Sequence, residues 1–140
     1  MQRFNIRAVV VGSLVMLAID ILTGIASFAF FAGDSLPSGP TQDEILVVAN
    51  VIGQNSDYLL ASLLLGTFST VLGGYIAARI AKNLPLFNAF AVGVVGIAAA
   101  ILLGGQSDSP WWFSAFGYIS TIPAAIVGGW LARRESKKGP

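Results

Sequence analysis

Residues 71–88 read VLGGYIAARIAKNLPLFN and join two long apolar runs of the chain. Arg79 and Lys82 lie between these runs, and Pro85 follows them in a turn of only a few residues. Because the connection is so short, the two flanking segments must be antiparallel neighbours. In lipid each segment must satisfy its own backbone polar groups, so each run is predicted to be a helix. The stretch predicts a hairpin of two membrane-spanning helices with basic residues at its turn.

The eight Lys and Arg residues of the chain fall in three short stretches. One precedes residue 8, one is the hairpin turn, and the third is a C-terminal cluster of Arg133, Arg134, Lys137 and Lys138. The other two connections, at about residues 33–57 and 106–110, hold acidic but no basic residues. By the positive-inside rule, both termini and the hairpin turn are expected in the cytoplasm. The C-terminal cluster either sets this topology or binds anionic lipid or an acidic partner.

Composition agrees with a membrane protein, since 55% of the residues are hydrophobic and 11% are charged. At about 20 residues per span, four spans use most of the 140 residues. We expect one all-α domain over residues 1–140, an integral membrane four-helix bundle of a bacterial inner (cytoplasmic) membrane. Its spans are predicted at residues 4–32, 57–82, 85–105 and 111–134. The first run is too long for the apolar core of a signal peptide, so we expect it to remain as a span.

The first outer loop, residues 33–56, is the only sizeable polar segment. Within it, Thr41 and Glu44 form a capping-box pattern that precedes the apolar residues 45–49. This pattern predicts an amphipathic helix at about residues 42–52, which is too short to span a membrane. It is expected to lie in the outer interface or to cap the bundle.

An internal repeat relates the two halves of the chain. Residues 71–79 align without a gap on residues 126–134, and Phe4-Asn5 matches Phe87-Asn88. One interpretation is two repeated helical hairpins, related by an axis along the membrane normal. The other is that Gly-Gly, an aromatic residue and Arg recur wherever a tightly packed helix reaches the cytoplasmic interface.

Small residues recur at helical spacing along three of the predicted spans. They are Gly66, Thr70, Gly73, Gly74, Gly96, Ala100, Gly104, Gly117, Thr121, Ala125, Gly128 and Gly129. Such lines let helix backbones approach closely where lipid offers no hydrophobic driving force. Packing within the bundle is the simpler interpretation; docking against copies of the chain or against a partner is the alternative.

Asp20 is the one ionisable side chain deep inside a predicted span. It lies thirteen residues beyond Arg7, roughly 20 Å along a helix at ~1.5 Å per residue. A carboxylate there is expensive, and an intramembrane acid is by default a functional candidate. Its expected partners are hydroxyl groups, namely those of Thr23, Thr67, Ser69, Tyr118 and Ser120. Asp20 is either a proton or cation site, or a hydrogen-bonding group between helices or across a protein interface.

The chain has no Cys and no His, which removes disulfides, thiolate nucleophiles and imidazole-based metal or catalytic sites. No paired carboxylates fall within a predicted span, and no glycine-rich phosphate loop follows a strand. We therefore expect no enzymatic activity, no cofactor, no metal and no nucleic-acid partner.

The GGYIAAR stretch at residues 73–79, followed after a short turn by FNAFAVG at residues 87–93, resembles small uncharacterised four-pass membrane proteins of bacteria. The resemblance covers the second and third predicted spans. Because such proteins have no established reaction, it implies architecture and membrane location only.

These features lead to two functional hypotheses. The first is a non-catalytic accessory or assembly subunit of a larger membrane complex, or a self-associating membrane module. Its partners would be the lipid bilayer and either another membrane protein or further copies of the chain. The alternative is a small proton- or cation-coupled transporter or channel that uses Asp20.

Overall fold

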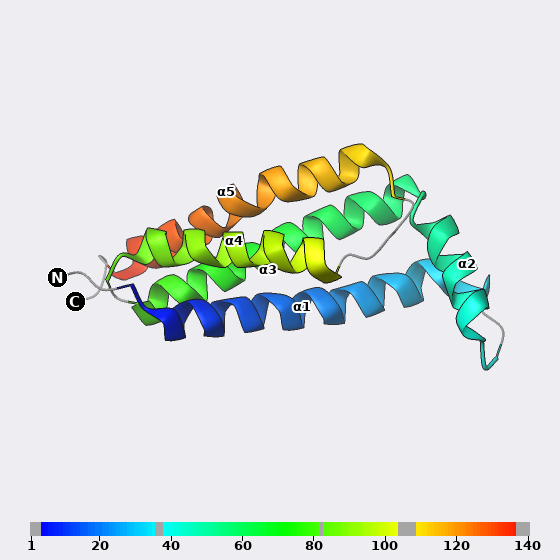
Figure 1. The fold of residues 1–140 in the computed structure, drawn as a ribbon, viewed down its shortest axis with the longest axis horizontal. Coiled ribbons are helices and arrows are strands. Elements are labelled where there is room, and N and C mark those ends of the chain that lie inside the picture. Colours follow the sequence, from blue (N-terminus) through cyan, green and yellow to red (C-terminus); the bar gives the residue numbers. More distant parts are fainter. Residues whose placement is uncertain (1–3, 36–37, 82, 104–108, 137–140) are drawn as a thin grey trace.

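The computed structural model describes residues 4–35, 38–81, 83–103 and 109–136. Within that part of the chain every regular element is helical (Figure 1). The elements are α1 (Ile6–Ala32), the 3-10 helix η1 (Gly33–Ser35), α2 (Gln42–Ile52), α3 (Ser56–Ala81), α4 (Pro85–Leu103) and α5 (Trp111–Ser136). All but η1 and α2 are long and apolar enough to cross a membrane. The prediction of an all-helical chain with four such helices is confirmed.

Local capping explains where two of the helices begin. The Asn5 side chain accepts a hydrogen bond from the Ala8 N–H at 3.1 Å, so α1 starts at Ile6 rather than at Phe4. Helix α2 has the predicted bounds, because Thr41 and Glu44 form both halves of the capping box. Helix α5 continues to Ser136, two residues beyond the predicted end. The last two residues of the predicted third span, 104 and 105, lie outside the described residues.

The capping box makes the stability of α2 dependent on pH. The backbone N–H of Thr41 donates to Glu44 Oε2 at 2.8 Å and its hydroxyl donates to the same atom at 2.9 Å. These two hydrogen bonds, of which the backbone bond has the larger effect, hold the pKa of Glu44 below its ordinary value of 4.5. Because the pKa of Glu44 is lower in the folded state, the cap stabilises the helix fully at pH values above the ordinary pKa. This stabilisation is lost as the pH falls through the folded-state pKa.

We therefore expect the amides of α2 to lose hydrogen-exchange protection between about pH 7 and about pH 3, after correction for intrinsic exchange rates. Glu44→Gln retains the hydrogen-bond acceptor of Glu44 but does not titrate, so its α2 protection should depend much less on pH. Equal pH dependence in the two proteins would show that the Glu44 cap does not control this helix.

The four long helices lie side by side. Helices α3 and α4 each contact the other three, whereas α1 and α5 lie on opposite sides of that pair (Figure 1). The start of α1, the α3–α4 turn and the end of α5 lie together, and we name this the hairpin end. Helix α2 lies at the other end, which we name the α2 end.

Glycines allow the closest helix contacts, and these contacts lie toward the hairpin end. A Cβ added at Gly12 of α1 would lie 2.6 Å from the Gly73 carbonyl oxygen of α3. One added at Gly74 would collide with the backbone of Ala125, and one at Gly128 with the carbonyl oxygen of Val71. Helix α3 therefore meets both α1 and α5 backbone to backbone here. The buried apolar cluster of Val9, Met16, Ala77 and Val92 lies in the same half.

Asn88 joins three segments at the hairpin end. Its Oδ1 accepts from the Asn5 N–H at 3.1 Å, and its Nδ2 donates to the carbonyls of Asn83 and Leu84 at 3.2 and 2.9 Å. Phe4 and Phe87 pack edge to face with ring centroids 5.8 Å apart. The Phe-Asn pairs matched in the proposed repeat thus lie against each other. Duplication itself stays a prediction.

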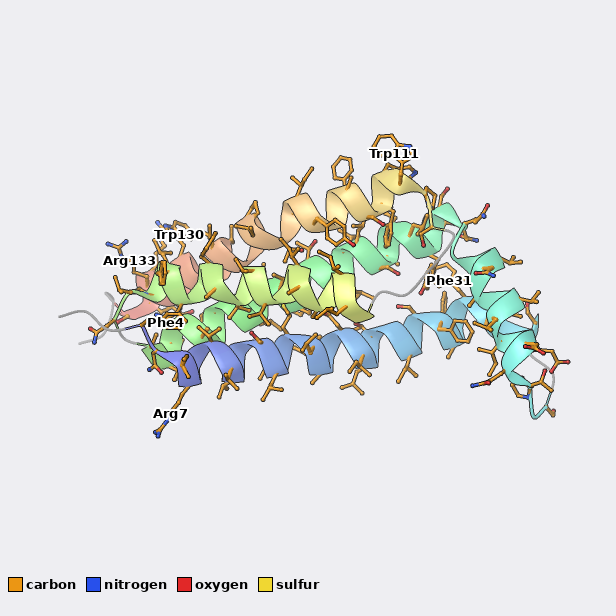
Figure 2. The ribbon with its side chains drawn as sticks, viewed as in Figure 1. Phe4, Arg7, Phe31, Trp111, Trp130 and Arg133 are labelled. Atoms are coloured by element: carbon orange, nitrogen blue, oxygen red, sulfur yellow. The ribbon has the colours of Figure 1, made fainter. Side chains whose placement is uncertain are left out.

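Large apolar side chains cover the outward faces of the long helices (Figure 2). Ile21, Leu22, Phe30, Leu102 and Ile119 are each more than half exposed. Such faces indicate a lipid environment rather than water. Arg7, Arg79, Arg133 and Arg134 all lie near the hairpin end and are exposed. Of the C-terminal basic cluster, Lys137 and Lys138 lie outside the described residues.

Candidate functional site

Asp20 is half-buried on the face of α1 that turns toward α3. Its Oδ1 accepts a hydrogen bond from the hydroxyl of Ser69, which is fully buried on α3. Thr23 does not bond the Asp20 carboxylate; its hydroxyl donates to the main-chain oxygens of Ile19 and Asp20. Of the five hydroxyl partners expected for Asp20, Ser69 is the one with which the structure records a bond.

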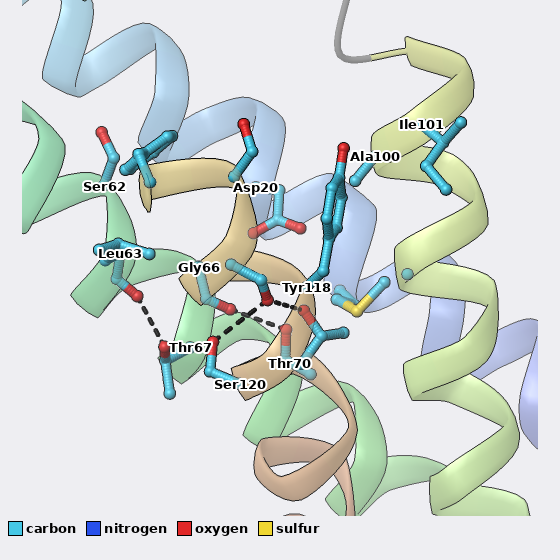
Figure 3. A pocket seen from close by; sticks show the side chains of 16 residues that line it. Asp20, Ser62, Leu63, Gly66, Thr67, Thr70, Ala100, Ile101, Tyr118 and Ser120 are labelled. Carbon is cyan, nitrogen blue, oxygen red and sulfur yellow. Dashed lines mark hydrogen bonds between the residues drawn. The ribbon is translucent and has the colours of Figure 1, made fainter. Parts of the chain in front are cut away.

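Asp20 borders a cavity of about 450 Å³ to which all four long helices contribute (Figure 3). The walls carry hydroxyl groups from two helices, α3 and α5. They are Ser62, Thr67 and Thr70 on α3, and Ser114, Tyr118, Ser120 and Thr121 on α5. Asp20 is the only ionisable residue other than Tyr118 among the described residues that line the cavity. The site therefore has a negative charge, or none if Asp20 is protonated.

The cavity exists because the small-residue lines do not make contact along their whole length. At Gly66 and Gly117 an added Cβ would meet nothing within 4 Å, so these glycines do not make the close helix contact that was expected of them. Both line the cavity, as do Thr70, Ala100 and Thr121. Gly96 also lines it, but a Cβ added there would lie 3.1 Å from Met16 and 3.3 Å from Thr121.

Toward the hairpin end the same lines do bring helices together. Gly73, Gly74, Gly128 and Gly129 all stand where an added Cβ would meet a neighbouring helix at 2.8 Å or less. Ala125 is fully buried against Gly74. Gly104 lies outside the described residues.

Four of the cavity hydroxyls donate their hydrogen to their own helix. Thr67 donates to the Leu63 carbonyl at 2.7 Å and Thr70 to the Gly66 carbonyl at 2.8 Å. Ser120 and Thr121 both donate to the Gly117 carbonyl, at 3.2 and 2.6 Å. A hydroxyl has one hydrogen and two acceptor lone pairs. What these four groups can still offer is acceptor capacity.

A second polar cluster lies at the hairpin end. Arg79 Nη1 is 2.7 Å from Glu135 Oε2, and the Tyr75 hydroxyl donates to the same oxygen at 2.5 Å. The Arg134 guanidinium lies over the Trp130 ring at 4.3 Å from its centroid. Arg79 and Glu135 are both more than half exposed, so the ion pair contributes little to stability. Its clearest role is to join the ends of α3 and α5.

Sequence reasoning did not assign Gly12 or Asn88 a role. The signal for Gly12 was its spacing, since Gly12, Met16 and Asp20 follow one another at intervals of four and share a helix face. The signal for Asn88 was an uncharged polar residue at the start of an apolar run, directly after a tight turn. Among the described residues there is no cluster of three or more acidic side chains that could hold a metal ion.

Comparison of the chain with protein-family models, with curated proteins and with solved structures finds no match. The resemblance to small four-pass membrane proteins therefore stays a prediction.

Proposed function

We propose that this chain is a membrane-embedded four-helix bundle that binds a cation at Asp20, as a small transporter or channel. The observation that carries the proposal is the cavity of about 450 Å³ beside the Asp20 carboxylate. An Asp that served only to join helices would need its hydrogen-bond partner but no adjoining space. Asp20 has one recorded side-chain partner, Ser69, and borders a cavity with many hydroxyl groups. Among the described residues no Lys or Arg side chain lines that cavity, so none of them would neutralise an anion there.

The cavity lies within the segment that we propose to cross the bilayer. Asp20 is fourteen residues from the start of α1 at Ile6 and twelve from its end at Ala32, about 21 Å and 18 Å at ~1.5 Å per residue. A carboxylate near the middle of a bilayer is retained where it faces a polar cavity or a partner charge. The polar walls around Asp20 meet this requirement.

We further propose that the hairpin end faces the cytoplasm of a bacterial inner membrane. The described basic residues lie near that end, whereas the acidic residues Asp43, Glu44 and Asp57 belong to α2 and the start of α3. This distribution agrees with the positive-inside rule.

An accessory or assembly subunit, or a self-associating module, is the second candidate. It was suggested by the lines of small residues, which could dock a partner. Most of the described residues in these lines, however, lie against a neighbouring helix or line the cavity. The observation that still favours it is the partial exposure of Asp20, since a partner helix with a hydrogen-bonding side chain could cover the cavity. The two candidates differ in whether the chain acts alone.

The transport proposal predicts cation movement that depends on Asp20. The full chain, reconstituted alone in liposomes, is expected to dissipate a gradient of a cation, tested with H⁺, Na⁺ and K⁺ in turn. Asp20→Asn should reduce the flux to that of protein-free liposomes, because it removes the only carboxylate among the described residues that line the cavity. Asp57→Asn, the same change at an exposed site in the first turn of α3, should leave the flux unchanged.

Native mass spectrometry of the protein, extracted gently from its own membrane, separates the two candidates. A monomer or homo-oligomer with Asp20-dependent flux supports transport. A stoichiometric complex with another polypeptide, together with no flux from the chain alone, would favour the accessory subunit. If Asp20→Asn changes neither flux nor assembly, Asp20 is not a functional cation site.

A further inference from the structure

We propose that the cavity beside Asp20 takes a protonated primary or secondary amine with an apolar body. This inference rests on the cation site proposed above and names the chemical class of its ligand. It is carried by the direction of the hydrogen bonds in the cavity wall.

The wall offers an excess of hydrogen-bond acceptors. Thr67, Thr70, Ser120 and Thr121 each donate their single hydrogen to a main-chain carbonyl of their own helix. Their remaining capacity is in oxygen lone pairs. The Asp20 carboxylate adds acceptor positions, of which Ser69 uses one, on Oδ1. The other three hydroxyls, those of Ser62, Ser114 and Tyr118, have no acceptor recorded among the described residues and can donate to a ligand. Acceptor positions outnumber them, so a ligand with several donors suits this space best.

A protonated amine supplies what the wall lacks. Its two or three N–H groups can bond the Asp20 carboxylate and neighbouring hydroxyl oxygens together, and such charge-assisted bonds are stronger than neutral ones. A quaternary ammonium has the same charge but no donor. Its methyl groups would cover the Asp20 carboxylate and the neighbouring hydroxyl oxygens without donating to their free lone pairs, so those acceptor positions would gain no hydrogen bond from the ligand.

The size and lining of the cavity call for more than an ammonium group. The volume of about 450 Å³ falls within the range of sites for small organic ligands, and it is far larger than a proton or a bare metal ion requires. Along α3 the lining runs from Ser62 to Thr70, eight residues or roughly 12 Å at ~1.5 Å per residue. Phe113, Leu63 and Ile101 give it an apolar side.

The aromatic rings do not decide between amine classes. Phe113 and Tyr118 both line the cavity, and an aromatic ring attracts any nearby cation whether or not it carries N–H groups. The discrimination must come from the acceptor oxygens. This makes the inference testable with a matched pair of ligands.

The experiment is isothermal titration calorimetry of the full chain in lipid nanodiscs, with protein-free nanodiscs as reference. The probes are 2-phenylethylammonium, its N,N,N-trimethyl derivative and neutral 2-phenylethanol. We expect the ammonium to bind about tenfold or more tightly than the trimethyl derivative, because only the ammonium makes charge-assisted hydrogen bonds. The alcohol, which lacks the charge, should bind more weakly than the ammonium.

Two variants and one control variant locate the binding. Asp20→Asn should weaken the binding of both cations by about tenfold or more, while Asp57→Asn should change the affinity for neither. Thr121→Val removes one acceptor oxygen with little change of shape. Thr121→Val should weaken the binding of 2-phenylethylammonium but not that of its trimethyl derivative. The two cations are compared on the unaltered protein, so that comparison does not depend on any variant folding.

The outcomes separate this inference from the proposed function. Equal or tighter Asp20-dependent binding of the trimethyl derivative overturns the amine class but keeps the cation site. The same holds if neither organic cation binds while flux of an inorganic cation still depends on Asp20. If no cation binds and no flux depends on Asp20, both proposals fail.

Discussion

Gly128→Ala is expected to destabilise the protein by about 3 kcal/mol, the upper part of the usual range for overpacking, or to prevent its folding. An added Cβ at Gly128 of α5 would collide with the carbonyl oxygen of Val71 and lie 2.8 Å from the Tyr75 nitrogen, both on α3. These are backbone atoms of a helix, so they cannot rotate away as the end of a flexible side chain can. The helices would have to separate and lose the dispersion contacts that hold them together in lipid.

Gly66→Ala on α3 is the matched control. An added Cβ there would meet nothing within 4 Å, so it introduces no clash. Ala is a better helix former than Gly by up to about 1 kcal/mol, so stability should stay the same or rise. Both variants are measured by thermal unfolding in detergent followed by circular dichroism. Equal stability of the Gly128→Ala and Gly66→Ala proteins would contradict the backbone contact between α3 and α5.

Asn88→Ala is expected to lower the free energy of unfolding by about 2 to 3 kcal/mol, since buried groups left without a partner cost about 1 to 3 kcal/mol. Asn88 is fully buried and makes bonds to Asn5, Asn83 and Leu84. Its loss removes the hydrogen bond from the main-chain nitrogen of Asn5, which joins α4 to the start of α1 beside the contact of Phe4 with Phe87. Leu84, which its amide group bonds, has a positive φ of 49°, an unfavourable conformation for leucine.

Asn88→Asp separates the two functions of the side chain. An aspartate retains an acceptor for the Asn5 N–H but loses both donors to the turn carbonyls. We expect a loss of stability for Asn88→Asp as well. Asn50→Ala, the same kind of truncation at an exposed position of α2, should change the unfolding midpoint little. If Asn88→Ala is as stable as Asn50→Ala, the hairpin end is held by other contacts.

Features that depend on local sequence were predicted well. The bounds of α2 agree to the residue, because a capping box involves only four consecutive residues and its chemistry is local. The long helices follow from apolar runs of spanning length, and their described ends differ from expectation by at most two residues; at the start of α1 the cause is the Asn5 cap.

The roles of the small residues could not be predicted from spacing. Gly66 and Gly74 lie on the same line of α3, two turns apart, yet one borders open space and the other meets the backbone of Ala125. Helices that cross at an angle touch over only part of their length. Periodicity shows which face a residue belongs to, and the crossing point decides whether that face meets a neighbour.

The sequence by itself determined the number and extent of the apolar helices, the separation of charge and the depth of Asp20 along its helix. Each of these is a property of chain position, composition or nearest neighbours. Only the tertiary structure decided that Ser69, forty-nine residues away, bonds Asp20 and that a cavity adjoins the pair. The physical reason is that both depend on how α1, α3 and α5 are rotated and where they cross. The contacts that set this geometry, such as those of Gly12 with Gly73 and of Gly74 with Ala125, join residues far apart in the chain.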